Sequence, residues 1–130
     1  MSDRRIRVSG TVVSGKGDGS RFTELDWVKK QFVDKIGFEP FPGTLNVLLK
    51  DATNRDILEV NKERTVAIEP PDKSYCKGVA LRAMISSTVM GAIIVPQVPG
   101  YSLDLLEIVA PMNLRGRLHL KNGDAITLQF

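Results

Sequence analysis

The chain has 130 residues, of which 42% are hydrophobic and 25% are charged, so it can form one globular domain with a proper core and leaves no room for a second. Eighteen Lys and Arg against fifteen Asp and Glu give a net charge of +3, which suits phosphorylated ligands or nucleic acid without requiring either. The single cysteine excludes an internal disulfide, and no apolar run is long enough for a signal peptide or a membrane span, so we expect a cytoplasmic protein.

Residues 5–14 are expected to form the first strand, because apolar Ile6, Val8 and Val12 alternate with polar residues. The stretch that follows, residues 15–22, has glycine at every second position from 15 to 19. Such a loop allows close backbone approach and leaves N–H groups free to bind an anion, and it also contains a lysine and an arginine. It lacks the ending of a Walker loop, and a flexible hairpin is the alternative interpretation.

Residues 24–36 are predicted to be the main α-helix. The apolar residues Leu25, Val28, Phe32 and Ile36 recur at helical spacing, and Thr23 is placed to cap the first turn. A glycine follows directly at position 37, where helices commonly end in a left-handed conformation.

The stretch 40–46 predicts a proline-stiffened turn that leads into a strand at residues 44–50. Alternation places Thr44 and Asn46 on one face and the apolar residues 45, 47 and 49 on the other, toward a core. A hydroxyl and an amide oxygen two residues apart can ligate one hard cation, such as Mg²⁺ bound to phosphates. The alternative is an ordinary turn and strand whose Thr and Asn bond to nearby backbone.

The second half of the chain predicts mostly short strands, with one short helix near residues 112–118. Glu107 lies on the face opposite Leu106 and Ile108, so it either faces solvent or lines a cavity where it would accept hydroxyl groups of a ligand. Many short strands with frequent turns indicate a mainly β fold, a small closed β-barrel. The expected strands are near residues 57–60, 65–68, 79–85, 89–95, 105–110 and 125–130.

Four stretches, taken in order, resemble the archaeal-type CTP-dependent riboflavin kinase family. They are residues 10–22, 37–46 (Gly-Phe-Glu-Pro-Phe-Pro-Gly-Thr-Leu-Asn), 106–115 and 120–124. The resemblance implies a single cradle-loop β-barrel domain over residues 1–130. It also implies transfer of the terminal phosphoryl group of CTP to the ribityl 5′-hydroxyl of riboflavin, giving FMN and CDP. We expect a monomer without nucleic-acid or membrane partners.

The resemblance also implies roles for individual residues. Thr44 and Asn46 would bind Mg²⁺, and Glu107 would contact the ribityl chain of the flavin. Glu107 is also the acidic residue that we name as a candidate general base. The nucleotide would be bound by Lys16, Gly17, Asp18, Gly19, Ser20, Arg21, Met112, Asn113, Leu114 and Arg115.

The chain departs from its relatives in two places, and three other functions stay open. Relatives often carry a threonine before the Glu107 strand, where this chain has Pro99-Gly100-Tyr101-Ser102. Some carry an N-terminal helix-turn-helix domain, which we do not expect here because the barrel motifs begin by residue 10. The alternatives are a nucleic-acid-binding barrel that uses the arginines at positions 4, 5 and 7, a non-catalytic sensor of flavin or nucleotide, and a kinase with ATP as donor.

Overall fold

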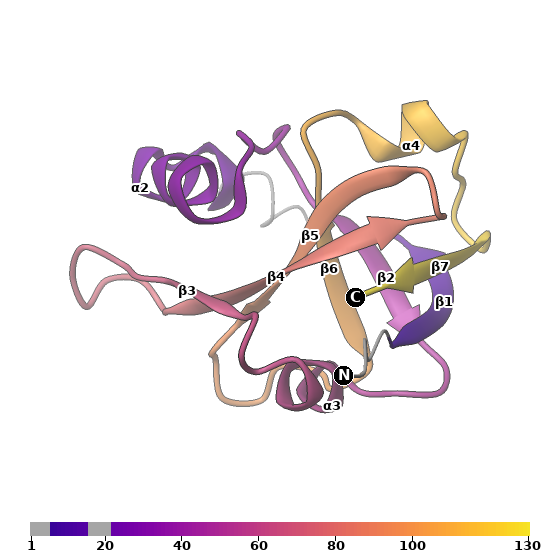
Figure 1. Ribbon diagram of the computed structural model, residues 1–130, viewed down its shortest axis with the longest axis horizontal. Helices are drawn as coiled ribbons and strands as arrows, with labels where there is room; N and C mark the ends of the chain where they lie inside the picture. Colours follow the sequence, from indigo (N-terminus) through magenta and orange to yellow (C-terminus); the bar gives the residue numbers. More distant parts are fainter. Residues whose placement is uncertain (1–5, 16–21) are drawn as a thin grey trace.

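A computed structural model of the chain describes residues 6–15 and 22–130 (Figure 1). No helix within these ranges combines the length and the apolar character needed to cross a membrane. The helical elements are α2 (Asp26–Gln31), the π-helix η1 (Phe32–Ile36), α3 (Asn54–Val60) and α4 (Leu114–Leu118). The strands are β1 (Arg7–Val13), β2 (Leu45–Leu49), β3 (Val66–Ile68), β4 (Gly78–Ile85), β5 (Val89–Pro96), β6 (Leu105–Val109) and β7 (Ala125–Gln129).

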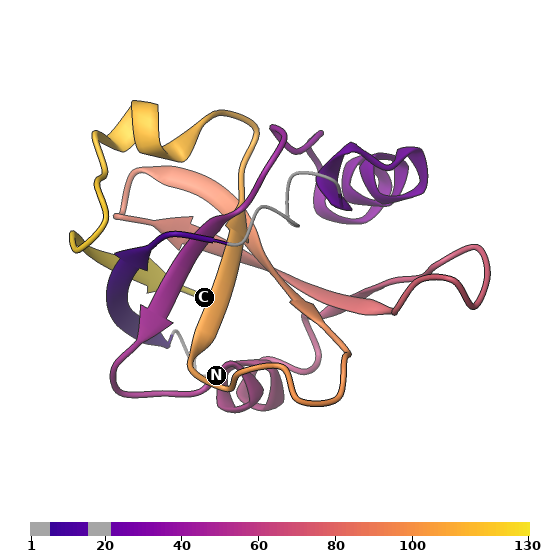
Figure 2. The same cartoon turned by 180° about the vertical axis from the view of Figure 1, so that it is seen from behind.

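The strands form one antiparallel sheet in the order β3-β4-β5-β6-β2-β1-β7. An additional pairing joins β4 to β7, where Met84 lies opposite Gln129 and Ile85 opposite Leu128. Six strands are thereby closed into a barrel, and β3 extends the sheet to one side (Figures 1 and 2). The predicted closed β-barrel is confirmed, and closure leaves those six strands without a free edge.

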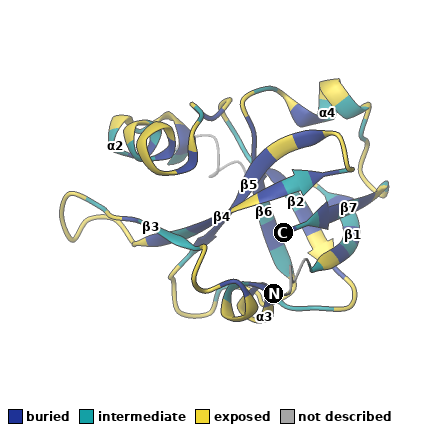
Figure 3. Cartoon of the chain, viewed as in Figure 1, coloured by how far each residue is buried: buried dark blue, intermediate teal, exposed yellow. Residues whose placement is uncertain are grey.

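The inside of the barrel is filled by buried aliphatic side chains from its six strands. Figure 3 shows buried segments on the strands of the barrel. On β2, Leu45, Val47 and Leu49 are buried, while the residue between the last two, Leu48, is exposed. This alternation confirms the expected orientation of the strand that follows the Pro-Phe-Pro-Gly turn. The outer face of β2 is therefore available for polar side chains.

A second core lies outside the barrel, where the helix formed by α2 and η1 covers the sheet. Val28, Phe32 and Ile36 are buried there. Full burial of each such side chain stabilises the fold by about 1.5–3 kcal/mol. They pack against buried residues of four strands, Ile68, Ala80, Ala92, Ile94 and Val109.

The predicted helix at residues 24–36 is confirmed in its apolar face and its end, but its first turn is different. It ends at Gly37, which has the expected left-handed φ of 111°, and its last five residues are π-helical. Leu25, not Thr23, is the N-cap of α2. The Thr23 hydroxyl instead accepts a hydrogen bond of 2.7 Å from the backbone N–H of Gly43, because this buried side chain lies against the Pro-Gly turn.

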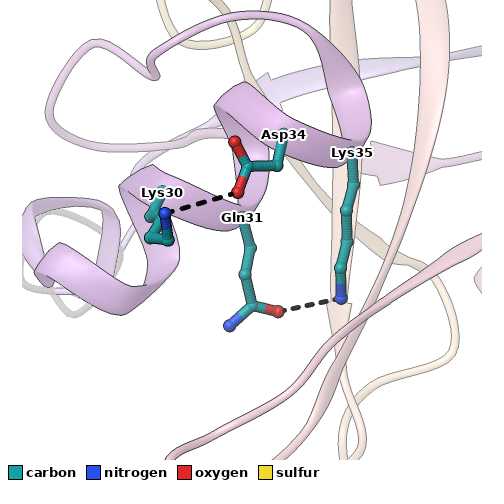
Figure 4. A network of polar contacts seen from close by, with 4 residues as sticks. All are labelled: Lys30, Gln31, Asp34 and Lys35. Atoms are coloured by element: carbon teal, nitrogen blue, oxygen red, sulfur yellow. Dashed lines mark hydrogen bonds and ion pairs between the residues drawn. The ribbon is translucent and has the colours of Figure 1, made fainter.

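Polar side chains of the same helix cover the edge strand β3. The Gln31 side chain forms two hydrogen bonds with the backbone of Glu69, of 2.8 and 2.7 Å, and Lys35 donates to the carbonyl of Ala67 at 2.6 Å. Figure 4 shows Lys35 donating to Gln31 at 3.1 Å, beside the exposed Lys30–Asp34 ion pair. The helix is thus fixed at both ends, to β3 and to the turn before β2.

The expected strand near residues 57–60 is wrong, because this segment is the helix α3. The Thr53 hydroxyl caps its N-terminus by accepting from the backbone N–H of Asp56 at 3.1 Å. Buried Ile57 supplies its contact with the barrel core. A short apolar run fits a strand or a helix equally well, and here the cap and the tertiary contact decide for the helix.

The short helix expected near residues 112–118 is present as α4, which begins at Leu114 after the N-cap Asn113. Strands are also found where we expected them at residues 65–68, 79–85, 89–95, 105–110 and 125–130.

Candidate active site

The candidate site lies on the outer wall of the barrel, where β2 and β6 are neighbours. In the register of these strands Asn46 is directly opposite Glu107. The residues flanking Glu107, Leu106 and Ile108, are buried in the barrel core, so the Glu107 side chain points outward, on the face opposite them that alternation predicted. Thr44 immediately precedes β2 and donates a hydrogen bond of 3.0 Å from Oγ1 to Glu107 Oε1. Three polar side chains expected from sequence thus meet on one face.

A fourth residue, Tyr101, belongs to the same cluster and was not predicted. Its hydroxyl donates to Glu107 Oε2 at 2.5 Å, a length typical of a hydroxyl bonded to a carboxylate. Burial raises the pKa of Tyr101 far above its usual value, and the hydrogen bond to Glu107 and the charge of Glu107 act in the same direction. Tyr101 is therefore a hydrogen-bond donor, and not a base, at any physiological pH.

The Asn46 amide lies against the backbone at the end of β1. Val13 is its partner in the register of β1 and β2, and Asn46 Nδ2 is 3.5 Å from the carbonyl of Thr44. A Cβ atom on Gly15 would overlap Asn46 Nδ2 and lie 3.0 Å from its Cγ. Glycine at position 15 therefore leaves space for the amide, and the chain enters the glycine-rich segment directly beside Asn46.

The predicted nucleotide-binding residues Lys16, Gly17, Asp18, Gly19, Ser20 and Arg21 lie outside the described residues. The structure describes the point where this segment begins, at Ser14 and Gly15. Ser14 Oγ accepts a hydrogen bond of 2.6 Å from Asn122 Nδ2, which ties the end of β1 to the turn before β7.

The second predicted nucleotide segment, residues 112–115, lies next to the Pro-Gly-Thr turn. Together they line a cavity of about 200 Å³ that includes Thr44, Met112 and Arg115. The side chain of Asn113 caps α4 by accepting from the N–H of Gly116 at 3.3 Å, and Leu114 is buried in the core. Asn113 and Leu114 thus hold the segment in place.

Arg115 connects this segment to the rest of the site. Its Nη2 donates to Asn122 Oδ1 at 2.8 Å and to the carbonyl of Val13 at 3.3 Å. Because Asn122 also bonds Ser14, one network joins α4, the end of β1 and the turn before β7. The structure therefore brings the Thr44 turn, the 112–115 segment and the start of the glycine-rich segment to one side of the barrel.

The atoms at this site that could ligate a metal ion are the oxygens of Thr44 and Asn46. Among residues 6–15 and 22–130, no group of three or more His, Cys, Asp and Glu is placed to hold one. The Thr44 hydroxyl directs its hydrogen toward Glu107, so its lone pairs point elsewhere. Hydroxyl and amide oxygens are ligands suited to Mg²⁺, and Thr44 and Asn46 therefore fit a hard cation that brings most of its own ligands.

Tyr101 could not be found by periodicity, because it lies in the loop between β5 and β6. Its backbone N–H donates to the carbonyl of Val98 at 3.2 Å across a turn in which Gly100 has a φ of 84°. The loop is further fixed by Asn54 of α3, whose Nδ2 donates to the carbonyls of Ser102 and Leu105, both at 2.8 Å. The only signal in the sequence was an aromatic hydroxyl following a Pro-Gly pair, six residues before Glu107.

Fold and site together define a small closed antiparallel barrel with a hydroxyl, an amide and a carboxylate on neighbouring strands of its outer wall. The family model for CTP-dependent riboflavin kinase, described as a domain of unknown function (DUF120), matches residues 12–130. The chain belongs to this family.

Relatives named riboflavin kinase match nearly the whole chain. The protein from Archaeoglobus fulgidus is 33% identical over 95% of this chain and 54% of its own length. The protein from Saccharolobus solfataricus is 32% identical over 99% of this chain and 76% of its own. That from Methanobrevibacter smithii is 31% identical over 96% of this chain and 100% of its own. The chain thus spans about half the length of some relatives and all of another.

Proposed function

We propose that this chain transfers the terminal phosphoryl group of CTP to the 5′-hydroxyl of the ribityl chain of riboflavin, giving FMN and CDP. Family membership and relatives named riboflavin kinase support the proposal. The observation that carries it is the Glu107 carboxylate, held outward between Thr44 and Tyr101 and opposite Asn46. An outward-facing carboxylate is a suitable acceptor for the hydroxyl groups of a ribityl chain.

The nucleotide is proposed to bind between the glycine-rich segment and the 112–115 segment. The cavity lined by Thr44 and Met112 to Arg115 supports this placement, because it puts a guanidinium group on the same side as Thr44. Lys16 to Arg21 would surround the phosphates with backbone N–H groups and two cationic side chains. The choice of CTP over ATP rests on the family, with residues 112–115 as the proposed reader of the base.

In the proposed reaction the 5′-oxygen of riboflavin forms a bond to the terminal phosphorus of CTP. The bond from that phosphorus to the bridging oxygen breaks, and CDP leaves with the electron pair. The hydroxyl proton passes to Glu107, the candidate base. Such transfers depend mainly on positioning and charge stabilisation, so a few fixed side chains suffice.

Thr44 and Asn46 are proposed to hold Mg²⁺, which would neutralise charge on the phosphates. Both ligands are neutral, so the protein alone should bind the ion weakly, and we expect it to arrive with the nucleotide. Titration of Mg²⁺ into the protein by calorimetry, with and without CTP, tests this. Tight binding to the nucleotide-free protein would contradict it.

The proposal is tested by measuring FMN formation from riboflavin and Mg²⁺ with CTP, ATP, GTP and UTP in parallel. We expect turnover with CTP that is lost in Asn46→Ala. Leu48→Ala is the matched control, because Leu48 lies two residues further along β2 on the same outer face and is 39% exposed. It should retain activity.

The other outcomes separate the alternatives. Turnover only with ATP would overturn the donor and keep the reaction. No turnover with any of the four, in a protein shown to be folded, would overturn the kinase and favour a sensor or a nucleic-acid-binding barrel. The proposal further treats the chain as a cytoplasmic monomer. Sedimentation of the purified protein would test the oligomeric state.

A further inference from the structure

The Glu107 carboxylate is held through both of its oxygens. Thr44 Oγ1 donates to Oε1 and the Tyr101 hydroxyl donates to Oε2. A carboxylate has about four acceptor positions, two on each oxygen, so these two donors leave about one free position on each. Fixed in this way, Glu107 presents a fork of two acceptors, which matches two adjacent hydroxyl groups of an acyclic polyol.

Tyr101 is itself rigidly placed. Its ring packs against the barrel core and borders a cavity of about 540 Å³ that is also lined by α3. The turn from Val98 to Tyr101 and the two bonds from Asn54 hold the loop from both sides. Holding a charged side chain in one orientation before a ligand arrives reduces the entropy that binding costs.

We propose that Tyr101 is a positioning residue that sets recognition of the ribityl chain by orienting Glu107. This rests on the proposed riboflavin kinase function and extends it to a residue outside the motifs that suggested that function. Tyr101 acts through Glu107, and its hydroxyl stays protonated because burial and the neighbouring carboxylate raise its pKa. The hydroxyl therefore remains a donor throughout the working pH range.

The test compares two flavins that share the ring system. Riboflavin carries the ribityl hydroxyls, and lumiflavin has a methyl group in their place. Binding of each is measured by the quenching of flavin fluorescence in the wild type and in Tyr101→Phe, which removes only the hydroxyl. We expect riboflavin binding to weaken about tenfold, as for the loss of a hydrogen bond to a charged group, and lumiflavin binding to change less than about twofold.

The chain offers a matched control, because it has two tyrosines. Tyr75 is 44% exposed and lies against Trp27, with ring centroids 5.4 Å apart. Tyr75→Phe should leave the binding of both flavins unchanged. Thermal melting of each variant confirms that it is folded.

A second variant shows whether Tyr101 acts through Glu107. Glu107→Gln alone should remove the preference for riboflavin over lumiflavin. In that background Tyr101→Phe should have less than about a twofold further effect, since coupled residues are not additive. A full tenfold loss in the Glu107→Gln background would overturn the inference, because it would show an independent role for the hydroxyl.

Two further results, obtained when the wild type does form FMN, would overturn the inference but not the proposed function. They are unchanged riboflavin binding in Tyr101→Phe, and an equal loss of binding for both flavins in that variant. A wild type that neither binds riboflavin nor forms FMN would overturn the proposed function as well, so the two failures are distinguishable.

Discussion

A methyl group added at Gly15 should disturb the Asn46 amide, which we propose as a metal ligand, without touching the rest of the site. The Cβ of Gly15→Ala would overlap Asn46 Nδ2, lie 3.0 Å from Cγ and lie 3.5 Å from Oδ1. Either the amide rotates away or the backbone at the end of β1 shifts. Because Gly15 is exposed and the amide is the end of a flexible side chain, we expect the amide to rotate.

The magnitude follows from the cost of that rotation. An amide held off its preferred rotamer costs on the order of 0.5–1.5 kcal/mol, and about 1.4 kcal/mol corresponds to a factor of ten in affinity. We therefore expect the Kd for CTP with Mg²⁺, measured by calorimetry, to rise about two- to tenfold in Gly15→Ala. Affinity for riboflavin should not change.

The matched control is a methyl group added where there is room. In Gly116→Ala the nearest atom to the new Cβ, Asn113 Cγ, is 3.9 Å away, an ordinary contact. This variant should bind CTP as the wild type does and gain up to about 1 kcal/mol of stability from the helix. Asn46→Ala removes the amide, so Gly15→Ala should cost nothing further in that background. An unchanged Kd in Gly15→Ala, or an equal loss in both backgrounds, would refute the reasoning.

Three other predictions concern the framework of the site. Asn54→Ala leaves the carbonyls of Ser102 and Leu105 without their side-chain donor, and it should lower the free energy of unfolding by about 1–3 kcal/mol in urea titrations and weaken riboflavin binding. Unchanged riboflavin binding would show that the loop holds its shape alone. Ile108→Ala, at a fully buried position, should cost about 2–5 kcal/mol against little for exposed Leu48→Ala, and equal costs would contradict the assigned register. The raised pKa of Tyr101 predicts that the stability of the wild type relative to Tyr101→Phe is constant below pH 10, the usual tyrosine pKa, and falls as the pH rises further, since only the unfolded chain then releases the proton. Paired melts at pH 8 and 11 measure the difference, and a relative stability that grows with pH would contradict it.

Local patterns were enough to predict the strands that carry the site. Alternation on β2 and β6 predicted that Asn46 and Glu107 lie on the face opposite their buried apolar neighbours, and both do. That they are direct partners depends on the register between strands about 60 residues apart in sequence, which periodicity does not encode. Barrel closure through β4 and β7 is likewise a long-range pairing. It could be expected only from the number of short strands and from the family resemblance.

The incorrect predictions for residues 57–60 and for the Thr23 cap have physical causes. Residues 57–60 were expected to form a strand because a short apolar run has no period of its own, whereas Thr53 with Asp56 three residues later was the capping signal for a helix. Thr23 is a good capping residue, yet its hydroxyl is used by Gly43, a partner 20 residues away. Tertiary contacts decided both cases.

The error at α3 and the omission of Tyr101 have one origin. Asn54 opens α3 and holds the loop that carries Tyr101, and Tyr101 in turn holds Glu107. A strand at this position would not place Asn54 against the carbonyls of Ser102 and Leu105, so it would neither bury this side chain nor order the loop. Thr44, which belongs to one of the motifs, binds one oxygen of the Glu107 carboxylate, whereas Tyr101, which binds the other oxygen, comes from a loop held by α3. Differences in acceptor recognition between members of this family should therefore be sought in α3 and the β5–β6 loop as well as in the motifs themselves.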